Sequence, residues 1–137
     1  LLFEPGTDYA YSNVGYSLLA AIIERVTGQS YEAYLVTELL VPADIIHTGY
    51  ERVYDDALAA RSRRGDTVRQ ASWGGHAPNW NLIGNGGLVS TPRDVIAWQH
   101  AYSSGTLVSP AARDMAHTPY QREGEGAPSF YGYGLVV

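Results

Sequence analysis

The fold is most strongly constrained by an apolar pattern of helical period that begins directly after Tyr11-Ser12-Asn13. Between residues 14 and 26 the apolar positions form one helical stripe, made of Val14, Leu18, Leu19, Ile22, Ile23 and Val26. Asn13 or Ser12 can cap the first turn, and Gly28 can end the last one. We therefore predict a helix over 14–26, and its start places a phenol and a carboxamide two residues apart, where both can point into one cleft.

Three further segments carry helix-start signals. Ser30 can cap a second helix, which Pro42 follows and whose apolar stripe is Tyr31, Leu35 and Leu39. Because about two residues join the first two helices, they should pack as neighbours. A third helix is predicted over 91–105, since a cap, a proline at the first position and a carboxylate follow one another there. A shorter fourth helix is predicted over 109–115 from the same start signal.

Strand patterns are short and few. Residues 48–54 and 131–137 alternate weakly between apolar and polar positions, and we predict a strand at each. Residues 65–87 lack any periodicity and are predicted to form a long ordered loop, while 124–128 should form a flexible one. A length of 137 residues with 45% hydrophobic and 17% charged content suits one globular domain. The predicted fold class is α+β, with helices dominating.

Composition excludes several kinds of function. The net charge of -5 and the sequence pI near 5.2 argue against a nucleic-acid partner or an anionic membrane surface. No apolar run approaches the roughly 18 residues that a membrane helix needs. The chain has no cysteine, which removes disulfides, thiolate metal sites and a cysteine nucleophile. The four histidines show no metal-ligand spacing, so neither a metal nor a cofactor is expected.

Tyr11 and Asn13 are the first candidates for chemistry. A tyrosine hydroxyl relays protons only where its surroundings favour the phenolate or provide a hydrogen-bonded path. The carboxamide of Asn13 has an acceptor and two donors, which suit a substrate amide or a lysine ammonium. The alternative is structural: Asn13 as a helix cap and Tyr11 as a half-buried ring. The chain has nine arginines and no lysine, so serine chemistry with a lysine base cannot be completed within these residues.

Two segments carry a family resemblance. The first is Phe3-Glu4-Pro5-Gly6 followed by Tyr9-x-Tyr11-Ser12-Asn13-x-Gly15-Tyr16 and, further on, Thr27-Gly28-Gln29-Ser30-Tyr31. The second is the glycine-rich stretch Gly84-Asn85-Gly86-Gly87-Leu88-Val89-Ser90-Thr91-Pro92-Arg93-Asp94. Both resemble the serine β-lactamase and penicillin-binding protein superfamily, in the branch of class C β-lactamases, D-alanyl-D-alanine carboxypeptidases and related esterases. The resemblance covers most of the chain, and 45–80 is poorly matched.

The resemblance implies a helical region and an α/β sheet with an active site between them, and an acyl group transferred to the serine of a Ser-x-x-Lys motif. By position, Tyr11 is the acid/base tyrosine and Asn13 orients the substrate, which is a small molecule or a peptide. The Ser-x-x-Lys motif is expected upstream, and a Lys-Thr-Gly or His-x-Gly motif downstream. The chain is thus expected to be one partial domain over 1–137 with an incomplete sheet. It requires the remainder of the hydrolase domain and is inactive alone, and the family's usual setting is extracytoplasmic.

Each of the other candidate site residues has a functional and a structural interpretation. Gly86 and Gly87 either allow close backbone approach near the cleft or form a tight turn that needs positive φ. His76 and Trp80, together with Trp73, either form the wall of an acyl-group pocket or cover the core.

Two other functions remain open. The chain is either a non-catalytic binding or interaction module that retains the helical framework, or a tyrosine-rich scaffold without a cleft. Finding both flanking motifs in the coding sequence would favour the hydrolase, and side chains of Tyr11 and Asn13 packed in the core would favour the scaffold.

Overall fold

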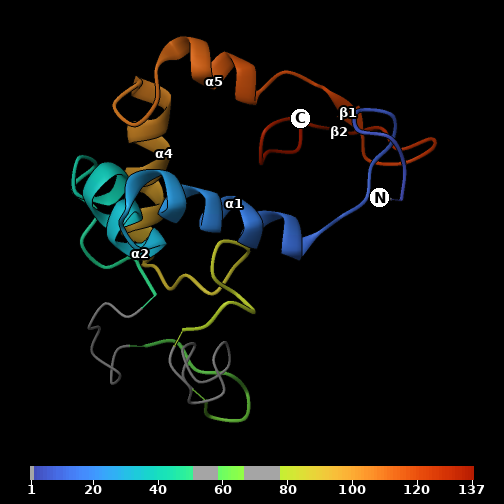
Figure 1. Cartoon of the computed structure of the whole chain (residues 1–137). Coiled ribbons are helices and arrows are strands. Elements are labelled where there is room, and N and C mark those ends of the chain that lie inside the picture. Colours follow the sequence, from blue (N-terminus) through green and yellow to red (C-terminus); the bar gives the residue numbers. More distant parts are fainter. Residues whose placement is uncertain (1, 51–58, 67–77) are drawn as a thin grey trace.

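The computed structural model describes residues 2–50, 59–66 and 78–137. In chain order the elements are α1 (Asn13–Thr27), α2 (Tyr31–Tyr34), the π-helix η1 (Leu35–Leu40), α4 (Pro92–Ser104), α5 (Pro110–Ala116), β1 (Gln121–Arg122) and β2 (Phe130–Tyr131). Helices dominate and the strands are short, so the α+β prediction is confirmed. Figure 1 shows α1 crossing the centre of the molecule, with the N-terminal segment lying beside β1 and β2.

The first predicted helix is confirmed as α1. Ser12 rather than Asn13 is the cap, because the Ser12 Oγ accepts a hydrogen bond from the Gly15 N–H at 3.0 Å. Asn13 is the first helical residue. Gly28 ends the helix in the left-handed region with φ of 72°.

The second predicted helix differs from expectation. Ser30 caps α2 as predicted, but after one turn the chain continues as the π-helix η1, closed by a hydrogen bond from the Val41 N–H to the Val36 carbonyl oxygen. The Glu24 carboxylate accepts a hydrogen bond from the Tyr31 N–H at 2.7 Å, which confirms that the first two helices are neighbours. The core lies against η1 and consists of Leu35, Leu40 and Ile45, with Ala97 of α4 packed on it.

The third helix, α4, has the predicted Thr91 cap and ends at Gly105. Its buried residue Asp94 accepts hydrogen bonds from the His47 N–H at 2.7 Å and from the Thr48 hydroxyl at 2.8 Å. The predicted strand over 48–54 is reduced in its described part to a single bridge between Gly49 and Val89, and its residues after 50 lie outside the described chain. These contacts connect the 47–49 segment to the start of α4.

The predicted fourth helix is confirmed as α5, but the predicted strand over 131–137 is wrong. β2 pairs antiparallel with β1, which places Tyr131 opposite Gln121. The chain then turns back at once, so that Tyr131 also bridges Val136. The cause is glycine: Gly134 has φ of 77°, and such a residue allows a tight turn where alternation alone indicates an extended strand.

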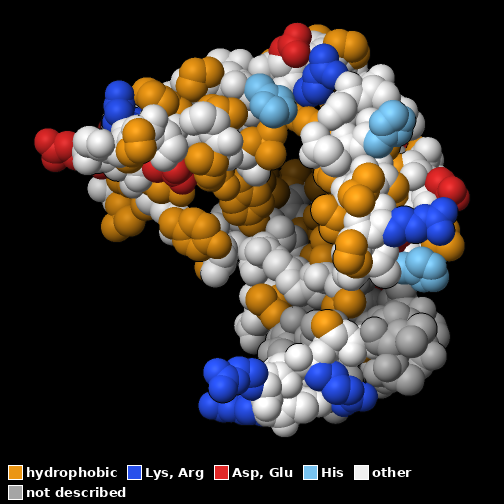
Figure 2. All heavy atoms as spheres, turned by 180° about the vertical axis from the view of Figure 1, so that it is seen from behind, with side chains coloured by type: hydrophobic (Ala, Val, Ile, Leu, Met, Phe, Trp, Pro, Cys, Tyr) orange, Lys and Arg blue, Asp and Glu red, His pale blue; other side chains and the backbone are white. Residues whose placement is uncertain are grey.

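The apolar stripe of α1 is largely exposed. Val14, Leu18, Ile22 and Val26 are spaced by four residues on one helix face, and each exposes more than half of its surface. Figure 2 shows hydrophobic side chains gathered around a hollow on the face turned away from the viewer of Figure 1. None of the helices in the described ranges has the length and apolar character that crossing a bilayer requires.

Candidate active site around Tyr11

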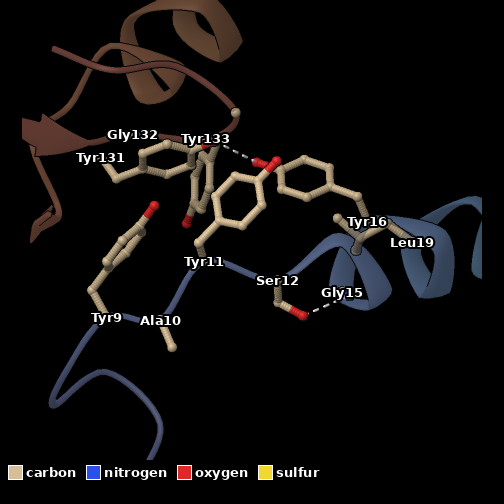
Figure 3. A pocket seen from close by; sticks show the side chains of 11 residues that line it. Tyr9, Ala10, Tyr11, Ser12, Gly15, Tyr16, Leu19, Tyr131, Gly132 and Tyr133 are labelled. Atoms are coloured by element: carbon tan, nitrogen blue, oxygen red, sulfur yellow. Dashed lines mark hydrogen bonds between the residues drawn. The ribbon is translucent and has the colours of Figure 1, made fainter. Parts of the chain in front are cut away.

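A pocket of about 560 Å³ lies between the start of α1 and the C-terminal segment. Most of its lining is aromatic or glycine: Tyr9, Ala10, Tyr11, Ser12, Gly15, Tyr16, Leu19, Tyr131, Gly132, Tyr133 and Gly134. Figure 3 shows the rings of Tyr9 and Tyr11 rising from the N-terminal segment toward the C-terminal one, with Tyr16 entering from α1. Five phenols therefore surround one opening.

Tyr11 lies in this pocket with 74% of its surface exposed. Its hydroxyl makes no hydrogen bond with any described residue. An exposed phenol without a protein partner has both its donor and its acceptor available for a hydrogen bond with a bound molecule. The structure thus places the first predicted site residue in an open pocket rather than in the core.

Asn13 is exposed but is not among the residues that line this pocket. It is four residues before Ser17 and so shares the helix face of Ser17. The Ser17 hydroxyl donates to the Ile83 carbonyl oxygen at 2.8 Å and accepts from the Asn85 side-chain amide at 2.8 Å. Tyr16, three residues after Asn13, lines the tyrosine pocket, so Asn13 begins the part of α1 that lies between this pocket and the 79–87 loop. Because Asn13 does not line the pocket that contains Tyr11, the expectation that both side chains point into one cleft is not met there.

Neighbouring phenols are held in their protonated form. Burial, the hydrogen bond with Tyr131 and the nearby phenols raise the pKa of Tyr16 to about 12. Partial burial, Glu123 and the neighbouring tyrosines raise the pKa of Tyr9. A phenol with an ordinary pKa near 10 is already neutral at neutral pH, and these shifts keep both hydroxyls protonated, and able to donate hydrogen bonds, to higher pH.

The glycine-rich segment contacts α1 at Gly84, a residue that the sequence analysis did not single out. A Cβ at Gly84 would lie 2.7 Å from both the Ala20 Cβ and the Tyr16 carbonyl oxygen, and the backbone there has φ of 83°. At Gly86 a Cβ would meet only the Leu82 side chain, at 3.7 Å. Gly87 has φ of 75°, which suits the tight-turn reading. Only the unusual density of glycine in 84–87 signalled this contact.

Of the residues predicted to form the wall of an acyl-group pocket, Trp80 lies in the described part of the chain. Trp80 is about half exposed and lies in the 79–87 loop, outside the tyrosine pocket. His76 and Trp73 lie outside the described residues.

Gly132 is a second residue that the sequence analysis did not single out. A Cβ there would lie 2.0 Å from the Ala116 carbonyl oxygen, so the position admits only glycine. One sequence pattern is shared by the two sides of the tyrosine pocket, the Tyr-x-Tyr spacing of 9–11 and 131–133.

A smaller pocket of about 220 Å³ lies beside α2 and includes Glu24 and Glu32. Both carboxylates accept backbone hydrogen bonds there, from the Tyr31 N–H and the Tyr50 N–H. Across the described ranges, no group of three or more His, Asp or Glu side chains is arranged to hold a metal ion. The two hydrogen bonds at this second pocket connect α2 to α1 and to the segment that ends at Tyr50.

Comparison with known proteins identifies the family. The Beta-lactamase family model matches residues 1–137. The chain is 28% identical to penicillin-binding protein 4* of Bacillus subtilis, over 98% of the chain and 32% of that protein. It is 33% identical to a D-aminopeptidase of Brucella canis, over 97% of the chain and 25% of that protein. The chain thus spans a third or less of the length of these relatives.

Solved structures agree on the fold. The octameric penicillin-binding protein homologue from Pyrococcus abyssi superposes with a TM-score of 0.72 at 26% identity, over 98% of this chain and 31% of that one. The D-amino acid amidase from Ochrobactrum anthropi, complexed with D-phenylalanine, gives a TM-score of 0.69 at 22% identity, over 98% of this chain and 42% of that one. Together with the match over all 137 residues, these likenesses show that the chain belongs to the β-lactamase family, within the serine β-lactamase and penicillin-binding protein superfamily.

Proposed function

We propose that residues 1–137 are one section of a serine hydrolase that cleaves amide or ester bonds through an acyl-enzyme. The observation that carries the proposal is the position of Tyr11, whose phenol is exposed in an open pocket at the start of α1. In this role Tyr11 is the acid/base residue that passes a proton between the attacking hydroxyl and the leaving group. Asn13 is exposed at the first position of α1 but does not line this pocket, and in this proposal it orients the part of the substrate amide that extends beyond the pocket.

The nucleophile comes from polypeptide outside residues 1–137. Acyl transfer requires an activated nucleophile, a proton shuttle and oxyanion donors in one site. The chain contains no lysine, so the lysine partner of a Ser-x-x-Lys serine cannot be supplied by these residues. In the complete protein, the serine approaches Tyr11 from the open side of the pocket. Gly86, Gly87 and Trp80, with His76, contribute to the substrate side from the glycine-rich segment and the loop before it.

The substrate is a β-lactam, a D-amino acid amide, a D-Ala-D-Ala peptide or an ester. The names of the relatives support this range, because one is a penicillin-binding protein, one a D-aminopeptidase and one a D-amino acid amidase. In this proposal, the specificity among these substrates is determined by the segments outside 1–137 that complete the pocket.

Tyr11→Phe in the full-length polypeptide tests the proposal. Loss of the hydroxyl should reduce turnover of a p-nitrophenyl ester by about 10²–10⁴-fold, the range typical of a general acid or base, while the fold is retained. Tyr34→Phe is the matched control, since Tyr34 lies on α2 and does not line the pocket. Unchanged turnover in Tyr11→Phe would remove Tyr11 from this role.

The isolated chain gives a second test. Residues 1–137 alone should neither hydrolyse a chromogenic β-lactam nor be labelled covalently by penicillin, whereas the full-length polypeptide should be labelled at a serine outside this range. Labelling of a serine within 1–137 would contradict the proposal. A full-length polypeptide that is never labelled and has no turnover would favour the non-catalytic binding module.

A further inference from the structure

Tyr131 contacts both sides of the segment that carries Tyr11. Its ring packs on Tyr9, with centroids 5.5 Å apart and planes inclined by 44°. Its hydroxyl lies 3.2 Å from the hydroxyl of Tyr16, with which it shares a hydrogen bond. Tyr9 precedes Tyr11 by two residues and Tyr16 follows it by five. One side chain from the far end of the chain therefore holds the backbone before and after Tyr11 (Figure 3).

The N-terminal side of the Tyr11 segment has few other contacts. Residues 8–11 precede the cap of α1 and belong to no helix or strand, and the Tyr11 hydroxyl has no hydrogen-bond partner among the described residues. The ring contact of Tyr9 with Tyr131 therefore provides tertiary support before Tyr11. After Tyr11, the hydroxyl pair of Tyr16 with Tyr131 adds to the contacts that α1 makes with the 79–87 loop.

Tyr131 itself is firmly placed. It pairs with Gln121 in the β1–β2 ladder, and its carbonyl oxygen accepts a hydrogen bond from the Tyr120 N–H at 3.2 Å. The next residues pack on the end of α5: Gly132 leaves no room for a side chain against Ala116, and the Tyr133 N–H donates to the Ala116 carbonyl oxygen at 3.1 Å. The contacts that Tyr131 makes with Tyr9 and Tyr16 thus connect the Tyr11 segment to the β1–β2 hairpin and the end of α5.

We propose that Tyr131 is a positioning residue for the reaction, and that it holds Tyr11 in place through its ring contact with Tyr9 and its hydroxyl pair with Tyr16. This inference rests on the proposed acid/base role of Tyr11. Tyr131 touches no reacting group in this account and acts only through the segment that carries Tyr11. The pair with Tyr16 operates across the neutral range, because both the burial and the hydrogen bond keep the Tyr16 hydroxyl protonated there.

Two substitutions at Tyr131 separate the two contacts in the full-length polypeptide. Tyr131→Phe removes the hydroxyl pair and keeps the ring on Tyr9, and it should lower kcat by about three- to tenfold, the effect of one hydrogen bond. Tyr131→Leu removes both contacts and should lower kcat by about 100-fold, as expected for a reacting group displaced by about 1 Å. KM should stay unchanged in both, because a misplaced acid/base group affects the transition state and not substrate binding.

A double-mutant cycle tests whether the hydroxyl pair is the cause. Tyr16→Phe should match Tyr131→Phe in kcat, and the double variant should be no worse than either single one. Tyr120→Phe is the control from the same hairpin, since its ring packs on Tyr133 and contacts neither Tyr9 nor Tyr16. It should leave kcat and KM unchanged.

The outcomes distinguish this inference from the proposed function. If Tyr11→Phe is inactive while Tyr131→Phe and Tyr131→Leu both keep full kcat, the positioning role is refuted and the role of Tyr11 stands. A lower melting temperature in Tyr131→Leu with unchanged kcat would also refute it, since the residue would then serve stability alone. Additive losses in the cycle would show that the two hydroxyls act separately. Full activity in Tyr11→Phe would refute both proposals.

Discussion

Gly84→Ala should destabilise the protein through two separable effects. The backbone at Gly84 has φ of 83°, and a left-handed conformation costs an alanine about 1–2 kcal/mol. The new Cβ would lie 2.7 Å from the Ala20 Cβ and from the Tyr16 carbonyl oxygen, and such overpacking costs about 1–3 kcal/mol. The free energy of unfolding should therefore fall by about 2–5 kcal/mol.

Gly28→Ala is the matched control for the first effect. Gly28 ends α1 with φ of 72°, and a Cβ there would meet nothing within 4 Å. The loss of unfolded-chain entropy that accompanies any glycine-to-alanine change is common to both variants and cancels in their difference. The difference between the two variants then measures the contact of the 79–87 loop with α1 alone, and should be about 1–3 kcal/mol.

Urea denaturation of the full-length polypeptide provides the measurement. The midpoint should move further for Gly84→Ala than for Gly28→Ala, with the dependence on urea unchanged. Because one of the two obstructing atoms is the backbone oxygen of Tyr16, whose side chain lines the tyrosine pocket, Gly84→Ala should also reduce kcat. Equal midpoints in the two variants would refute the close packing of Gly84 on α1.

Two further predictions concern stability. Asp94→Ala leaves the His47 N–H and the Thr48 hydroxyl without their shared acceptor, and the free energy of unfolding measured with urea should fall by about 2–4 kcal/mol. Asp114→Ala is the control, because its side chain is 77% exposed and its loss should change stability by less than about 0.5 kcal/mol. Equal effects of the two substitutions would contradict the role of Asp94. The pKa of Tyr16 is about 12 in the folded chain against an ordinary value of 10, so the folded state holds this proton more tightly, and stability should fall as pH rises from 10 to 12. Tyr16→Phe should flatten that decline, and a slope identical to that of the unmodified protein would exclude Tyr16 as its source.

Local chemistry was sufficient to predict where most helices begin. The side chains of Ser12, Ser30, Thr91 and Ser109 all accept the capping hydrogen bond that their positions indicated. A cap involves residues within one turn, so the sequence contains all the information that it needs. The π-helix η1 was not predicted, because hydrogen bonds between residues five apart in the sequence leave no distinct pattern in the apolar spacing.

The site depended on contacts between distant residues. Tyr131 meets Tyr16 across 115 positions of sequence, and Gly84 meets Ala20 across more than 60. Such contacts follow from the path of the whole chain, which a single sequence does not specify. The sequence therefore indicated Tyr11 through its local motif, while the contacts of Tyr131 with Tyr9 and Tyr16 were recognised only from the structure.

The exposed apolar stripe of α1 bears on how the proposed hydrolase is completed. Val14, Leu18, Ile22 and Val26 expose 68%, 59%, 56% and 79% of their surfaces, although full burial of one such side chain stabilises a protein by about 1.5–3 kcal/mol. Since the curated relatives are at least three times as long as the matched region, we propose that the polypeptide that completes the hydrolase covers this stripe. Residues 1–137 alone should then bind a hydrophobic dye such as ANS strongly, and Leu18→Gln with Ile22→Gln should reduce that binding. Equal dye binding by the full-length polypeptide would show that the stripe stays exposed and would contradict this proposal.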